Sequence, residues 1–108
     1  MEAQNIKLYQ LRNNSGQVEG LPNNPRLIKD DRFKKLVKSL QDDPEMLSLR
    51  ELIVFPHKDT FVVIGGNMRL KALRELGYTE APCKVLPADT HIEKLKAIAL
   101  KDNSSFGD

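Results

Sequence analysis

Apolar residues fall into four short runs that predict β-strands. Residues 6–11 alternate apolar and polar side chains, which is typical of a strand with one buried face. Three further apolar runs predict strands at 52–55, 61–64 and 81–86. Residues 56–60 form a short turn between the second and third runs, so we expect those two strands to pair as a hairpin.

Two segments repeat apolar residues with helical spacing. The earlier helix begins at Asp30 or Asp31, with acid in its first turn as the helix dipole favours, and ends near Pro44. A short further helix through residues 45–49 fits the pattern. The last helix begins at a capping box, with Thr90 as N-cap and glutamate three residues later. The apolar stripes are Phe33, Leu36, Val37 and Leu40 in one helix and Ile92, Leu95, Ile98 and Ala99 in the other.

The stretch 61–77 joins a buried strand to a further helix through two glycines. Gly65 and Gly66 allow the backbone to turn sharply and to approach another group closely. We expect Asn67 to be the N-cap of this helix and Gly77 to be its C-terminal glycine. Its apolar stripe consists of Met68, Ala72, Leu73 and Leu76.

A strand, a glycine turn and a helix together form a common anion-binding geometry. The first N–H groups of a helix lack intrahelical partners, and the helix dipole adds roughly half a positive charge at that end. Arg69 and Lys71 would add two cations beside the amides of residues 66–68, so a phosphate would find donors and charge together. The alternative interpretation is a purely structural turn, with Arg69, Lys71 and Arg74 on a solvated helix face.

Chain length and element order predict one domain of the α+β class, a short mixed sheet with helices packed on it. We expect residues 1–108 to form this single domain, with a folded core at about 6–100 and a polar tail cut from a longer protein. No apolar run approaches the roughly 20 residues of a membrane span, and no signal peptide is recognisable, so we expect a cytoplasmic protein without membrane contact. The single cysteine, Cys83, excludes an internal disulfide and fits a small core or edge position.

Basic residues are clustered although the formal net charge is only +2. Residues 65–74 hold three bases and no acid. A second positive region lies between residues 24 and 38 and consists of Arg26, Lys29, Arg32, Lys34, Lys35 and Lys38. Either region suits a nucleotide or a nucleic-acid backbone, and solvated helix faces would look much the same.

Metal-binding patterns are sparse. His57 and His91 are far apart in the sequence and have no cysteines at zinc-site spacing. The acidic pairs at 30–31 and 42–43 would suit the divalent metal of a nuclease, whereas acidic pairs at helix ends are more often caps. We therefore predict no resident metal site.

Two segments in this order resemble the ParB/sulfiredoxin superfamily, and specifically its ParB-like N-terminal (nuclease-like) domains. One is an Asn-Pro segment followed by a helix ending in Leu-Val-Lys-Ser-Leu and then a strand, at residues 21–26, 36–40 and 52–54. The other, residues 64–72 with Leu76-Gly77, is similar to the family's second box, Gly-Glu-Arg-Arg-x-Arg-Ala. The resemblance covers about residues 6–100.

This resemblance implies a pocket for nucleotide phosphates, because the second box holds the triphosphate of CTP in ParB and of ATP in sulfiredoxin. The implied cofactor is CTP or ATP with Mg²⁺. Gly66 stands at the box glycine, Arg69 at the second arginine and Lys71 at the third basic position. Arg26 and Lys29 are candidates for the opposite wall. The implied phosphate-binding set is Gly65, Gly66, Asn67, Met68, Arg69, Lys71, Asn24, Arg26 and Lys29.

Two positions depart from the second box. Asn67 replaces its glutamate, which removes a carboxylate able to help hold a metal. Met68 replaces its first arginine, which removes one charged donor. Whether the protein hydrolyses a nucleotide or cleaves DNA therefore stays open. Sulfiredoxin needs a cysteine and a histidine in its Gly-Gly-Cys-His-Arg loop, and Asn67 and Met68 occupy those positions here, so sulfinate reductase chemistry is excluded.

The C-terminal run Lys-Asp-Asn-Ser-Ser-Phe-Gly is similar to phage and mobile-element ParB-domain proteins associated with DNA methylases. The resemblance implies a nucleotide or DNA as partner, and a C-terminal domain or a DNA methylase as a further one. The leading hypothesis is a phosphate-binding domain in DNA partitioning, modification or mobile-element processes. A metal-dependent nuclease using Asp30 or Asp31, and a non-catalytic DNA- or protein-interaction module, are the alternatives, and the oligomeric state is open.

Overall fold

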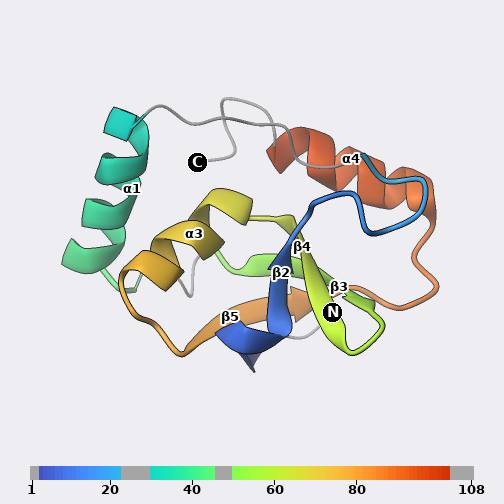
Figure 1. The fold of residues 1–108 in the computed structure, drawn as a ribbon, viewed down its shortest axis with the longest axis horizontal. Coiled ribbons are helices and arrows are strands. Elements are labelled where there is room, and N and C mark those ends of the chain that lie inside the picture. The colour runs from blue at the N-terminus through green and yellow to red at the C-terminus, as the bar shows by residue number, and fades with distance from the viewer. Residues whose placement is uncertain (1–2, 23–29, 46–49, 103–108) are drawn as a thin grey trace.

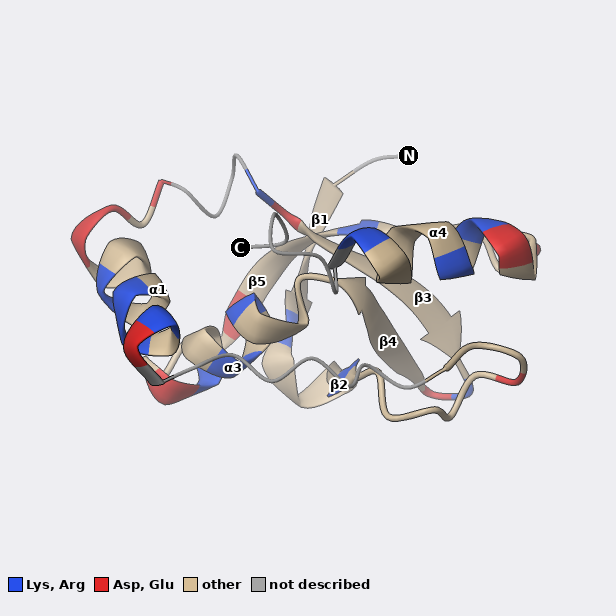
Figure 2. Ribbon diagram, turned by 90° about the horizontal axis from the view of Figure 1, so that it is seen from above, with Lys and Arg blue, Asp and Glu red and all other residues tan. Residues whose placement is uncertain are grey.

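A computed structural model describes residues 3–22, 30–45 and 50–102 (Figure 1). Both views place α3 between α1 and the strands, with α1 and α4 at opposite ends of the long axis (Figures 1 and 2). The elements in chain order are β1 (Ala3–Lys7), the 3-10 helix η1 (Leu8–Gln10), β2 (Leu11–Asn13), α1 (Asp30–Asp42), β3 (Leu52–His57), β4 (Thr60–Gly65), α3 (Asn67–Glu75), β5 (Glu80–Val85) and α4 (Ile92–Asp102).

The strands form one five-stranded mixed sheet in the order β1-β5-β3-β4-β2. β5 pairs with β1 antiparallel and with β3 parallel, while β4 pairs with β3 antiparallel and with β2 parallel. Helices pack on this sheet, so the predicted α+β class is confirmed. The structure also adds the strand order, which the linear pattern does not contain.

Two apolar clusters lie on opposite faces of the sheet because neighbouring residues of β3 and β4 alternate between them. Val54 and Val63 belong to the cluster that α1 and α3 cover, whereas Val62 and Ile64 belong to the cluster that α4 covers. The predicted helical stripes supply the helix side of both clusters. Leu40, Leu73 and Leu95 are the most deeply buried members of the three stripes, together with Ala72.

The predicted strand at residues 6–11 is wrong in its extent, because η1 divides it into β1 and β2. β1 and β2 are consecutive in the chain yet occupy opposite ends of the strand order. The four peptide units from Lys7 to Leu11 span at most about 14 Å, whereas the edges of a flat five-stranded sheet would lie about 19 Å apart. The sheet therefore curls, and the 3-10 turn carries the chain between its two edges.

The predicted hairpin of β3 and β4 is confirmed, but its turn is shorter than residues 56–60. His57 pairs with Thr60, so only Lys58 and Asp59 form the turn, and Lys58 has a φ of 54°. Pro56 lies within β3, opposite Phe61. A proline is tolerated there because the pairing of β3 with β5 has already ended at Val54, and no neighbouring strand needs its missing N–H.

The predicted capping box of α4 is wrong. The Thr90 hydroxyl donates to the carbonyl of Pro87 at 2.6 Å. His91 precedes α4, its carbonyl accepts the amide of Lys94, and its ring Nδ1 accepts the amide of Glu93 at 3.1 Å. The imidazole therefore acts as the N-terminal cap, because the chain reaches the first helical turn one residue later than the capping-box spacing predicts.

Helix α1 begins at Asp30 and ends at Asp42, within the predicted bounds. The short helix predicted through residues 45–49 falls mostly outside the described residues. Helix α3 ends as predicted: Gly77 has a φ of +80°, its amide donates to the carbonyl of Arg74, and the Tyr78 amide donates to that of Leu73. These two bonds are those of a Schellman motif, which the glycine permits.

Candidate phosphate site at the β4–α3 turn

The glycine turn lies where the sequence predicts it, between the last residue of β4 and the first of α3. Gly66 precedes the helix with a φ of 102° and ψ of 25°, a left-handed conformation that L side chains rarely adopt. A Cβ on Gly66 would lie 2.6 Å from Cδ2 of Leu52 and 3.2 Å from Nη2 of Arg69. Glycine is therefore required here twice, for the backbone conformation and for the space.

Asn67 is not the N-cap, which corrects the prediction. Gly66 occupies that position, and its carbonyl accepts the amide of Leu70 at 3.0 Å. The Asn67 side chain is buried and serves other elements: Oδ1 accepts the Asn14 amide at 2.9 Å, and Nδ2 donates to the Val63 carbonyl at 3.0 Å. Its carboxamide therefore ties α3 to β4 and to the chain leaving β2, instead of closing the end of the helix.

Arg69 does not point into bulk solvent. Its side chain is only 8% exposed, and Nη1 donates to the carbonyl of Arg50, just before β3. Nη2 lies beside Gly66, at the position where a side chain on that residue would clash with it. A guanidinium charge is thus held against the first turn of α3, in which no residue is acidic.

The other predicted residues of the second box differ in exposure. Gly65 is enclosed, because an added Cβ would contact Ile53 and Ile98 at 3.5 Å. Met68 is buried, whereas Lys71, in the second turn, is exposed. The turn is therefore covered partly by apolar side chains, and of the two predicted cations that the structure describes, Arg69 and Lys71, the lysine is the more exposed. The predicted residues Asn24, Arg26 and Lys29 lie outside the described residues.

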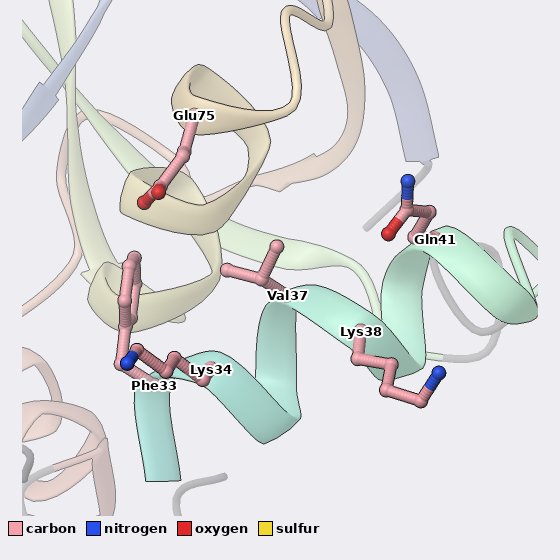
Figure 3. A pocket seen from close by; sticks show the side chains of 6 residues that line it. All are labelled: Phe33, Lys34, Val37, Lys38, Gln41 and Glu75. Atoms are coloured by element: carbon pink, nitrogen blue, oxygen red, sulfur yellow. The ribbon is translucent and has the colours of Figure 1, made fainter. Parts of the chain in front are cut away.

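A cavity of about 240 Å³ lies elsewhere, between α1 and α3 (Figure 3). Glu75 from the last turn of α3 faces it, and the remaining lining residues come from α1: Phe33, Lys34, Val37, Lys38 and Gln41. Phe33 and Val37 also pack against the apolar cluster under α3. None of the predicted phosphate-binding residues that the structure describes, those at 65–69 and 71, lines this cavity.

Several residues around the turn were not predicted from sequence. Asn13 and Asn14 follow the first predicted strand, and both bind Asn67. Arg50 supplies the carbonyl that holds Arg69, and Leu52 covers Gly66. The run of asparagines after β2 was the only sequence signal for these residues. Buried asparagines need hydrogen-bond partners, but a linear pattern does not identify which residues those partners are.

The other predicted positions lack the features of a metal or thiol site. In the described ranges, no group of three or more histidine, cysteine or acidic side chains is arranged to hold a metal ion. Asp42 pairs with Lys38 at 3.4 Å, as expected of a helix-end acid. Cys83 is fully buried, as predicted, and burial followed by the charge of Glu51 raises its pKa to about 12. Such a thiol is a poor nucleophile.

Comparison with known proteins identifies the family. The amino-acid sequence matches the family described as ParB N-terminal domain over residues 2–104. The chain belongs to this family. The predicted ParB-like domain is thereby confirmed, and the fold comparison agrees with it. No curated protein sequence shows significant similarity to the chain.

Solved structures with this fold include C-terminally truncated ParB from Caulobacter crescentus. The form complexed with CTP-gamma-S has a TM-score of 0.73 and 16% identity, over 95% of this chain and 53% of that one. The form complexed with the centromeric parS site has a TM-score of 0.66 and 18% identity, over 93% and 46%. This ParB-family chain thus spans about half the length of those proteins.

A more distant structural relative is a free serine kinase in complex with AMP. Its TM-score is 0.57 and its identity 15%, over 82% of this chain and 32% of the kinase. At such identities the likeness concerns the fold alone. Among the described residues, no helix combines the length and the apolar composition that crossing a bilayer requires.

Proposed function

We propose that this ParB N-terminal domain binds the phosphates of a nucleoside triphosphate, CTP or ATP with Mg²⁺, at the turn between β4 and α3. The supporting observation is electrostatic. The positive end of the α3 dipole and the buried guanidinium of Arg69 are held together, and the first turn contains no acidic residue. An anion bound there would be attracted by the dipole and by the guanidinium at once.

The position of Gly66 supports the same proposal. Its left-handed backbone places the residue beside the Arg69 guanidinium, where glycine adds no side chain of its own, while Leu52 covers the same residue. A phosphate oxygen approaching the start of α3 would meet this guanidinium, and Lys71 would contribute a more exposed point charge. Asn24, Arg26 and Lys29 are proposed for the opposite wall on the family resemblance alone.

Isothermal titration calorimetry with CTP, ATP and GTP, each with and without Mg²⁺, tests the proposal. We expect one nucleotide to bind, and Lys71→Ala to weaken it about tenfold through loss of one charge-assisted contact. Lys94→Ala, on the exposed face of α4, is the matched control and should bind as the wild type does. Arg69→Ala should abolish binding, but it is informative only if circular dichroism shows that the variant is folded.

Absence of binding by all three nucleotides, or equal affinities for wild type and Lys71→Ala, would overturn the nucleotide proposal. We further propose that this binding serves DNA partitioning, modification or a mobile element, with a DNA methylase or a C-terminal domain as partner. The C-terminal sequence similarity supports that setting. The nuclease alternative has its own test, Mg²⁺-dependent plasmid cleavage that is lost in Asp31→Asn.

A further inference from the structure

Two arginines from distant parts of the chain meet at the β2 edge of the sheet. Arg74 of α3 donates from Nη2 to the Leu11 carbonyl, and Arg12 of β2 donates from Nη1 to the same oxygen, each at 2.9 Å. The two nitrogens therefore lie within twice that distance of each other. Figure 2 shows the basic positions of β2 and α3 on neighbouring segments.

Each guanidinium is oriented by further hydrogen bonds. Nη1 of Arg74 donates to Oδ1 of Asn13 at 2.8 Å, and Nη1 of Arg12 also donates to the Tyr9 carbonyl. All of these acceptors are neutral. Because a guanidinium has five N–H donors, both side chains retain donors beyond those used here. Two preorganised forks with spare donors suit an oxyanion better than two freely rotating side chains would.

Charge repulsion at this edge is not compensated within the part of the chain that the structure describes. Neither Arg12 nor Arg74 forms an ion pair there, whereas four lysines elsewhere do. Partial burial, followed by the charge of Arg12, lowers the pKa of Arg74. The fold thus holds two like charges together at a cost that an arriving anion would offset.

Neighbouring side chains extend the same surface. Lys71 is exposed and lies three residues before Arg74 on α3, a spacing that places the two on one helix face. Tyr9, whose carbonyl holds Arg12, has a side chain that is 74% exposed. Base stacking on an exposed aromatic ring beside guanidinium groups is a common mode of binding nucleic acid.

We propose that the Arg12–Arg74 pair is a second anion site, which holds a phosphate of a nucleic-acid backbone on the surface of β2 and α3. The Arg12–Arg74 pair lies outside the β4–α3 turn, and apart from the shared Lys71 the surface uses none of the residues proposed to bind a nucleotide there. The non-bridging oxygens of a phosphodiester match two adjacent guanidinium forks. The row of positive charge continuing to Lys71 favours a polyanion over a single free phosphate.

Fluorescence anisotropy of a fluorescein-labelled DNA duplex of mixed sequence, titrated with the 108-residue chain at several salt concentrations, tests the site. Arg12→Gln is the principal variant because this side chain is exposed and bonds only backbone carbonyls within three residues of it, those of Tyr9 and Leu11. We expect it to weaken binding about threefold or more and to reduce the salt slope by about one. Arg74→Gln should do the same if circular dichroism shows it to be folded.

Lys94→Gln removes the same charge from α4 and is the matched control. Equal losses in Arg12→Gln and Lys94→Gln would overturn the proposal in favour of diffuse charge, as would wild-type affinity in Arg12→Gln. Displacement of the duplex by polyglutamate as effectively as by unlabelled DNA would instead indicate an acidic protein partner. Displacement by CTP that is lost in Arg12→Gln would assign the pair to the nucleotide and overturn a separate nucleic-acid site.

Discussion

The side-chain amides of Asn13 and Asn67 meet across 54 residues of sequence, where Nδ2 of Asn13 donates to Oδ1 of Asn67 at 2.9 Å. The same nitrogen also lies 3.2 Å from the Asn67 carbonyl. Asn13 ends the edge strand β2, and Asn67 begins α3. This contact therefore attaches a three-residue strand, which has little pairing of its own, to the helix that carries the candidate phosphate site.

Replacing Asn67 should test how much of the fold depends on this contact. In Asn67→Ala the buried Asn14 amide loses its acceptor, the Val63 carbonyl loses its side-chain donor, and Nδ2 of Asn13 keeps only the backbone carbonyl of residue 67, so we expect the free energy of unfolding to fall by about 2–4 kcal/mol. Urea unfolding followed by circular dichroism measures the change. Asn5→Ala, an exposed position on β1, is the control and should cost no more than about 0.5 kcal/mol.

Two glycines with similar backbone conformations should respond differently to substitution. Gly66 and Gly77 have φ values of +102° and +80°, but an added Cβ meets Leu52 at Gly66 and nothing within 4 Å at Gly77. We expect Gly77→Ala to cost about 1–2 kcal/mol from backbone strain. Gly66→Ala should cost about 3 kcal/mol or more because the core must also move. Equal urea midpoints would contradict this view of the turn.

The N-terminus of α4 provides a local test of the structure against the sequence pattern. His91→Ala removes the acceptor of the Glu93 amide and should lower the free energy of unfolding by about 1 kcal/mol. His91→Asn should recover most of that loss, since an asparagine oxygen can accept the same bond. A larger loss of stability from Thr90→Ala than from His91→Ala, measured by thermal unfolding, would support the predicted capping box with Thr90 as N-cap instead.

The buried thiol of Cys83 should make stability fall at alkaline pH. Burial, and then Glu51, raise its pKa from 9.0 in the unfolded chain to about 12 in the folded one. Between these values the unfolded state binds fewer protons than the folded state, so the free energy of unfolding decreases as pH rises. Below pH 9 the contribution of the protonated thiol is fully present.

Urea unfolding of wild type and Cys83→Ala at pH 8 and at pH 10 measures this effect. The titrations of lysines and tyrosines are common to both proteins and cancel in the comparison. We expect wild type to be the more stable at pH 8, because the substitution leaves a cavity, and the difference to narrow at pH 10. A difference that is the same at both pH values would mean that Cys83 does not ionise as its burial implies.

Local patterns predicted those features whose causes lie within a few residues. The apolar stripes of α1, α3 and α4 contribute to the two apolar clusters because side chains three and four residues apart share one helix face. Gly77 ends α3 because the left-handed conformation is required directly after the last turn. The glycine turn at 65–66 was predicted because two adjacent glycines allow a sharp turn of the backbone. The location of the candidate site follows from that turn.

Other features depend on which segments the sheet brings together. The 3-10 turn after Lys7 exists because β1 and β2 lie at opposite edges of a curled sheet, although the alternation of residues 6–11 continues through it. Asn67 suits an N-cap by residue type, but Asn13 and Asn14 compete for its oxygen once β2 lies beside β4. The preference of asparagine for an N-cap position depends on local interactions. Hydrogen-bond partners from distant segments override that preference when the side chain is buried beside them.

By itself the sequence determined α1, α3 and α4, most of β3, β4 and β5, and the position of the glycine turn, because hydrophobic periodicity and backbone sterics act over a few residues. Only the tertiary structure decided the order of the strands, the burial of Arg69 and the meeting of Arg12 with Arg74. Those features arise from pairing between segments that are distant in the chain. Many alternative pairings satisfy the same local pattern, and burial of the whole core selects one of them.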